Sequence, residues 1–182
     1  TFDYTKIKEL RPLTVIPFDT HLMINEPVKQ IQNYIDAGSD IVTVHAEVCD
    51  ESSFGEIHDL LKSHKVSVGL AINPDTSMPD WSKKFISTLD QIIVMSVVPG
   101  KSGQKYIENT HEKTKSLLTN LKEDGFTGYI ESDGGVTLDN IGECFADGAR
   151  AFVGGSAIIG QTDVRLVIRE FRNRVLRTRR KL

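Results

Sequence analysis

The sequence predicts an α/β fold of the (β/α)8 or TIM barrel type. Short apolar runs alternate with amphipathic helical stretches at intervals of mostly about 22 to 26 residues. Glycine or polar turns separate the two kinds of segment, and no linker or shift in composition interrupts them. This alternation indicates consecutive right-handed βαβ units and an all-parallel sheet. We therefore expect residues 1–182 to form a single domain.

The number of units is smaller than a complete barrel requires. The sequence supplies six strand–helix units and an N-terminal helix over Tyr4–Leu10, and it begins at Thr1 rather than Met. A (β/α)8 barrel has eight units and about 200 residues or more. We therefore expect a barrel that lacks its first strand, first helix and second strand. Its two unpaired edges should make residues 1–182 alone insoluble, molten or oligomeric, and inactive. A doubly wound open sheet is the alternative, but no Gly-rich fingerprint follows the first run.

The individual elements follow from periodicity and from the residues that interrupt it. Gly38, Gly125 and Gly148 are placed to end helices, and Pro27 and Pro79 are placed to begin them. The expected strands start near Phe18, Ile41, Ser67, Gln91, Tyr129 and Ala151. The expected helices are Val28–Ala37, Phe54–His64, Trp81–Leu89, Tyr106–Glu123, Leu138–Asp147 and Val164–Leu176.

Composition favours a globular cytoplasmic enzyme. Hydrophobic residues make up 39% and charged residues 26% of the chain. No apolar run reaches the roughly 18 residues that a membrane-spanning helix needs, so we expect no membrane partner. Cys49 and Cys144 are too few and too far apart for a disulfide scaffold or a zinc motif.

The net charge of −3 argues against nucleic-acid binding, although the C-terminal stretch is basic. That stretch could contact RNA or an acidic partner, but a solvated terminal helix is the favoured interpretation. Its basic residues are Arg165, Arg169, Arg172, Arg174, Arg177, Arg179, Arg180 and Lys181.

Two glycine clusters indicate a phosphorylated ligand. Asp133-Gly134-Gly135 and Gly154-Gly155-Ser156 each follow a strand-like run and precede a helical one. Glycines in such turns let backbone N–H groups approach an anion at a helix N-terminus. Taken alone, such a glycine cluster is more often an ordinary turn than a phosphate site.

The carboxyl ends of the expected strands carry the residues with chemistry, because these ends share one rim of a barrel. Read in order, they are His21 with Met23, His45 with Glu47, Asn73, Met95, Asp133, and Gly155 with Ser156. A histidine and a carboxylate on one rim suit one divalent cation of the zinc, iron, manganese or cobalt type.

These segments resemble the ribulose-phosphate 3-epimerase family of metal-dependent (β/α)8 barrels. Phe18-Asp19-Thr20-His21-Leu22-Met23 resembles the family's D-x-H-L-M motif. Similar segments follow in the family's order over essentially the whole chain. They are 37–40 with His45-Ala46-Glu47, 69–74, 94–97 before Pro99-Gly100, 132–136 and 153–158.

The resemblance implies an epimerase that interconverts ribulose 5-phosphate and xylulose 5-phosphate, in pentose phosphate metabolism. Asp133 would be an acid–base group and a metal ligand, and His21 a second ligand and a substrate contact. Met23 and Met95 would line the reacting face. The phosphate would bind the backbone of Gly134, Gly135, Gly155 and Ser156, beneath a closing loop of Gly100, Lys101, Ser102 and Gly103. We also expect the full-length protein to form a homo-oligomer.

Several departures limit this transfer of roles. The family's second strand supplies a histidine and an aspartate as further ligands, the aspartate being the partner acid–base group, and neither is in residues 1–182. Lys101 and Ser102 replace the commoner Phe and Gly of the loop. The alternatives are an allulose-6-phosphate 3-epimerase and a non-catalytic phosphosugar-binding barrel. A relative of indole-glycerol-phosphate synthase fits less well, because His21-Leu22-Met23 and 132–135 argue against it.

Overall fold

The protein contains one all-parallel, six-stranded sheet. The computed structural model describes residues 2–100 and 103–182. The strands follow the chain in the order β1-β2-β3-β4-β5-β6, so each strand pairs with the next one in sequence. The predicted succession of parallel strands, each paired with the next, is confirmed. The strands are β1 Asp19–Leu22, β2 Ile41–His45, β3 Ser67–Ile72, β4 Gln91–Met95, β5 Tyr129–Asp133 and β6 Ala149–Val153.

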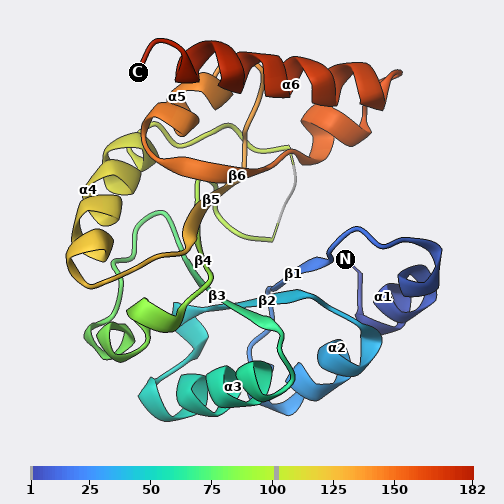
Figure 1. Ribbon diagram of the computed structural model, residues 1–182, viewed down its shortest axis with the longest axis vertical. Coiled ribbons are helices and arrows are strands. Elements are labelled where there is room, and N and C mark those ends of the chain that lie inside the picture. The colour runs from blue at the N-terminus through green and yellow to red at the C-terminus, as the bar shows by residue number, and fades with distance from the viewer. Residues whose placement is uncertain (1, 101–102) are drawn as a thin grey trace.

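The α-helices lie around the outside of the strands (Figure 1). The first helix agrees with the prediction residue for residue, because the Asp3 carboxylate caps it by accepting from the N–H groups of Thr5 and Lys6 at 3.1 and 3.2 Å. The helices are α1 Tyr4–Leu10, α2 Ile31–Ala37, α3 Glu51–Ser63, α4 Thr110–Glu123, α5 Ile141–Ala146 and α6 Val164–Arg179.

The predicted α-helix over Trp81–Leu89 is wrong. Two 3₁₀ helices, Asp80–Lys84 and Ile86–Thr88, occupy this connection. The Ser82 hydroxyl donates to the carbonyl of Pro79 at 2.7 Å, and the Thr88 hydroxyl donates to that of Phe85 at 2.8 Å. Each bond reaches three residues back, the spacing of a 3₁₀ turn, and competes with a continuous α-helical ladder.

Three other helices begin later than predicted, and one strand begins earlier. A 3₁₀ turn over Pro27–Lys29 precedes α2, α4 begins at Thr110 instead of Tyr106, and α5 begins at Ile141 instead of Leu138. In β6 the pairing begins at Ala149 rather than Ala151, after a register shift beside Ile130 in β5. The helices are predicted to start too early because the apolar periodicity of the sequence continues through these turns, whose apolar side chains still face the protein interior.

The outer face of the sheet packs against the helices and forms the main hydrophobic core. Val44, Leu70 and Ile92 on the strands are at most 1% exposed, as are Phe54 and Ile57 of α3. Burying such aliphatic side chains stabilises the fold by about 1.5–3 kcal/mol each. The core therefore holds the strands in a fixed register, which in turn fixes the positions of their carboxyl ends.

The sheet is strongly curled. Nδ1 of His21 in β1 and Oδ2 of Asp133 in β5 lie only 3.1 Å apart, although three strands separate β1 from β5. Neighbouring strands are about 4.8 Å apart, so a flat sheet would separate these two strands by roughly 19 Å. Curvature of this kind agrees with the barrel prediction and excludes a flat arrangement of the inner residues.

Other features of the surface agree with the sequence. Among the described residues, we find no helix with the length and apolar character needed to cross a membrane. The side chains of Cys49 and Cys144 are free thiols. The basic residues of the C-terminal stretch are exposed, whereas Phe171 holds α6 on the protein.

Candidate functional site at the carboxyl ends of the strands

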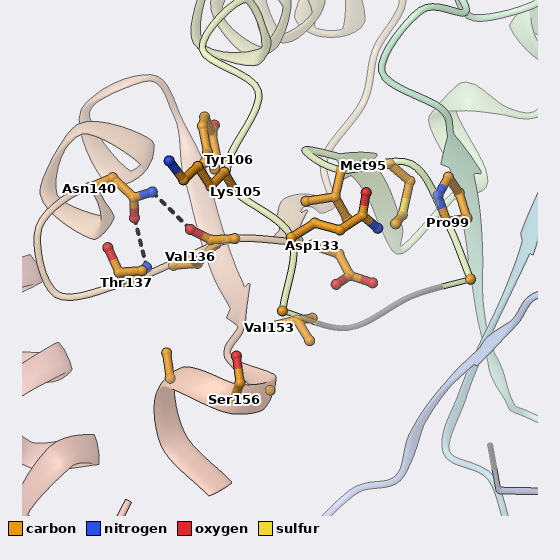
Figure 2. Close-up of a pocket in the computed structure, with 18 of the residues that line it drawn as sticks. Met95, Pro99, Lys105, Tyr106, Asp133, Val136, Thr137, Asn140, Val153 and Ser156 are labelled. Atoms are coloured by element: carbon orange, nitrogen blue, oxygen red, sulfur yellow. Dashed lines mark hydrogen bonds between the residues drawn. The ribbon is translucent and has the colours of Figure 1, made fainter. Parts of the chain in front are cut away.

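A cavity of about 780 Å3 opens at the carboxyl ends of β4, β5 and β6. Asp133 at the end of β5 lies between Met95 of β4 and Val153 of β6 (Figure 2). The cavity lies within the size range of small-molecule sites. This is the edge at which the sequence places its chemically active residues.

Most of the predicted substrate-binding residues line this one cavity. Lys101 and Ser102 lie outside the described residues. The predicted residues that line the cavity are Met23, Met95, Gly100, Gly103, Asp133, Gly134, Gly135, Gly155 and Ser156. The two glycine clusters therefore face the same space.

The Gly134-Gly135 turn needs glycine at both positions. The φ angles of these residues are +118° and +63°, in the region that favours glycine. A Cβ atom on Gly134 would lie 2.3 Å from Val97, and one on Gly135 would lie 2.4 Å from the backbone nitrogen of Tyr106. The turn therefore packs tightly and presents its backbone at the cavity wall. By contrast, a Cβ on Gly155 would meet no atom within 4 Å.

Asn140 braces this turn and was not predicted. Its side-chain amide donates to the carbonyl of Gly135 at 3.0 Å, and its Oδ1 accepts from the N–H of Thr137 at 2.8 Å (Figure 2). The Thr137-x-x-Asn140 spacing just before a helix is the available sequence signal, because Asn favours such turns. Lys105 and Tyr106 also line the cavity. They lie in a connection whose path periodicity does not specify.

His21 belongs to the site through Asp133 instead of through the cavity wall. Its side chain is 13% exposed and that of Asp133 is 15% exposed. On its other edge, His21 Nε2 lies 2.8 Å from Nε2 of His45. Nδ1 of His45 lies 3.2 Å from Oε2 of Glu47. The sequence places these residues on one rim but contains no signal for the contacts between them.

Glu47 is held in turn by the end of β3. The backbone N–H of Asn73 donates to Glu47 Oε1 at 2.7 Å, and the Thr76 hydroxyl donates to the same oxygen. Although burial by itself raises the pKa of this carboxyl, the hydrogen bonds from His45, Thr76 and Asn73 outweigh it and lower the pKa to about 2. Glu47 is therefore ionised at neutral pH.

A second carboxylate cluster lies deeper on the inner face. Burial, followed by the charges of Asp19 and Asp133, raises the pKa of Glu131 to about 9. Gln91 contacts this cluster, because its Nε2 lies 3.3 Å from Oδ1 of Asp19. The Tyr129 hydroxyl donates to Oε1 of Gln91. At neutral pH, Glu131 is therefore a protonated acid that can donate a hydrogen bond.

Within residues 2–100 and 103–182, no group of three or more His, Cys, Asp or Glu side chains is placed to hold a metal ion. His21 and Asp133 offer two donors, an imidazole nitrogen and a carboxylate oxygen 3.1 Å apart. Metal–ligand distances of about 2.0–2.2 Å place two donors of a tetrahedral zinc site about 3.3 Å apart. The pair therefore fits two of the ligands of such a cation.

Comparison with known proteins identifies the family. The model of the Ribulose-phosphate 3 epimerase family matches residues 1–159. The chain is 38% identical over 160 residues to the chloroplastic ribulose-5-phosphate-3-epimerase of Arabidopsis thaliana, covering 86% of this chain and 56% of that protein. It is 36% identical to the ribulose-phosphate 3-epimerases of Escherichia coli K12 and Bacillus subtilis, covering 92% and 91% of this chain and 73% and 76% of theirs.

Solved structures with low identity support the fold alone. The chain is similar to KGPDC from Streptococcus mutans, with a TM-score of 0.72, 17% identity and coverage of 94% of this chain and 78% of that one. It is also similar to orotidine 5'-monophosphate decarboxylase from Sulfolobus solfataricus, with a TM-score of 0.66, 10% identity and coverage of 98% and 94%. Together with the family match over most of its length, the sequence identities show that the chain belongs to the ribulose-phosphate 3-epimerase family.

Proposed function

We propose that the protein is a ribulose-phosphate 3-epimerase, an isomerase of pentose phosphate metabolism that interconverts D-ribulose 5-phosphate and D-xylulose 5-phosphate. The observation that carries this proposal is the 3.1 Å contact between His21 and Asp133, at the edge of a cavity that two glycine clusters line. Family membership and the names of the relatives support it.

Asp133 is proposed to transfer the proton. Epimerisation next to a ketone removes a proton from carbon, leaves an enediolate, and returns a proton to the opposite face. The Asp133 carboxylate enters the cavity from the end of β5 and can act on one face. By family resemblance, the partner group for the other face is an aspartate outside residues 1–182.

His21 and Asp133 are proposed to hold one divalent cation of the zinc, iron, manganese or cobalt type. Their donor atoms and separation support this assignment, and the family's further ligands would come from outside residues 1–182. When bound, the cation supplies positive charge that stabilises the enediolate. Met23 and Met95 border the cavity with apolar sulfur, which keeps water from the reacting carbon.

The substrate phosphate is proposed to bind the backbone N–H groups of Gly134, Gly135, Gly155 and Ser156. Both clusters border the cavity, and Lys105 adds a positive charge to its wall. Backbone donors at tight turns bind anions without the entropy cost of ordering long side chains. The Gly100–Gly103 loop is proposed to close over the bound sugar phosphate.

We also propose that the curled sheet is part of a closed (β/α)8 barrel in one cytoplasmic domain that assembles as a homo-oligomer. The contact between β1 and β5 supports the closed barrel, because it requires the curvature that a barrel has.

The test measures epimerisation of D-ribulose 5-phosphate by the full-length protein, before and after metal removal, with allulose 6-phosphate as a second substrate. We expect metal removal to abolish turnover and re-addition to restore it. His21→Ala should lower both metal content and rate. Unchanged turnover in metal-free His21→Ala would contradict the assignment, and binding of the sugar phosphate without turnover would favour a non-catalytic barrel.

A further inference from the structure

A chain of contacts leads away from the proposed cation site toward α4. It runs from Asp133 to His21, then to His45, and ends at Glu47. The two imidazole rings are 16° from parallel, with centroids 4.8 Å apart and Nε2 atoms 2.8 Å apart. The two nitrogens therefore lie between the ring centres, at a hydrogen-bonding separation.

The far end of this chain is fixed rigidly. Glu47 Oε1 accepts from the Asn73 N–H and the Thr76 hydroxyl, so only Oε2 faces His45. Lys113 of α4 donates to the carbonyls of Asn73 and Thr76, the latter at 2.6 Å. Glu47 thus lies in a loop that a second element of the fold holds in place.

The hydrogen-bonding capacity of Glu47 determines the direction of the bonds. An ionised carboxylate only accepts, so His45 Nδ1 must carry the proton that faces it. In a neutral His45 ring with its proton on Nδ1, Nε2 keeps a lone pair and accepts from Nε2 of His21. His21 therefore carries its proton on Nε2 and keeps a lone pair on Nδ1, the atom 3.1 Å from Asp133.

We propose that His45 and Glu47 are positioning residues that fix the tautomer of His21, so that its Nδ1 lone pair faces the cation site shared with Asp133. The inference rests on the proposed function, because it assigns a role toward the same cation. A hydrogen bond to the second nitrogen of a ligating imidazole fixes ring orientation and raises basicity, and losing it typically costs about 10–100-fold in metal affinity.

The first test records long-range ¹H–¹⁵N correlation spectra of the metal-free protein at pH 8, labelled at histidine nitrogens. We expect the proton of His21 on Nε2 and that of His45 on Nδ1. A proton on His21 Nδ1 would overturn the proposal. This measurement needs neither a variant nor activity, so it remains informative if the proposed epimerase reaction is not observed.

The second test uses Glu47→Gln, which is nearly isosteric. If the amide nitrogen faces His45, it donates to Nδ1, moves the proton of each ring to the opposite nitrogen and places N–H against Asp133. We expect this reversal in the spectra, and we expect zinc affinity of the metal-free protein, measured by titration calorimetry, to fall about 10–100-fold.

His58→Gln is the matched control, because His58 also contacts a carboxylate, that of Asp59, far from the cation site. Its zinc affinity should stay within about twofold of wild type. Unchanged tautomers and zinc affinity in Glu47→Gln would overturn the positioning role. If wild type binds no zinc, the proposed cation site fails instead, while the wild-type spectra still decide the tautomer.

Discussion

The outer face of the sheet carries aliphatic side chains such as Leu70 and Ile92, whereas the inner face of the same strands carries Gln91, Glu131 and His21. On the outer face, the side chains are stabilised by burial, which does not require one particular apolar neighbour. On the inner face, each polar group depends on one particular partner, as His21 depends on Asp133. The difference indicates that stability and chemistry are assigned to opposite sides of one set of strands.

Asp133→Asn should distinguish the two faces most clearly, because it should reduce catalysis without reducing stability. The amide cannot take the substrate proton, so we expect kcat to fall by about 10²–10⁴-fold, the typical contribution of such a group. The melting temperature should change little, because the substitution is nearly isosteric at the mouth of the inner face. Asp59→Asn, whose side chain is 85% exposed, is the control. A rate near that of wild type would remove Asp133 from the mechanism.

Leu70→Ala tests the outer face. Leu70 is fully buried in the main core, and truncating such a residue costs about 2–5 kcal/mol of unfolding free energy. Denaturant unfolding should detect the loss, while zinc affinity of the folded protein stays unchanged. Leu13→Ala, at a side chain 76% exposed, should change stability by less than about 0.5 kcal/mol. A large change in zinc affinity would show that the two faces are coupled.

Gly155→Asp probes the cavity wall without disturbing either face of the sheet. A Cβ atom at this position would meet no atom within 4 Å, so the fold should persist. Its carboxylate would repel the substrate phosphate, and we expect KM to rise at least tenfold, equivalent to about 1.4 kcal/mol. Gly155→Ala, which adds bulk without charge, should have a smaller effect. Equal KM values for both variants would argue against phosphate binding here.

Glu131→Gln should have the smallest effect, a change in how stability depends on pH between about 4.5 and 9. The pKa of Glu131 in the fold, about 9, is above its ordinary value of 4.5. Its contribution to stability is therefore complete below pH 4.5 and is lost as pH rises toward 9. The glutamine side chain keeps a hydrogen-bond donor but does not titrate. The melting temperature of the Glu131→Gln variant should therefore fall less than that of the wild type between pH 5 and 9. A difference of 1 kcal/mol would appear as roughly 2–4 °C, and identical pH profiles would contradict the raised pKa.

The sequence predicts the outer face better than the inner one. Periodicity and caps are local, so α1 with its Asp3 cap and the order of the strands are predicted correctly. The predicted α-helix over residues 81–89 is wrong, because the hydroxyls of Ser82 and Thr88 donate to carbonyls three residues back. The residues at the strand ends are recognised, but the contact of His21 with His45 depends on sheet curvature, which no local pattern encodes.

The consecutive order of the strands also has a consequence for how the chain folds. Each strand pairs with the next in sequence, so the sheet can grow one unit at a time by closing loops of modest length. The contact between His21 and Asp133 instead closes a loop of 112 residues. Because the entropy cost of closure rises with loop length, this contact should form among the last. A folding intermediate would then contain most of the sheet before it could bind a metal ion or act on a sugar phosphate.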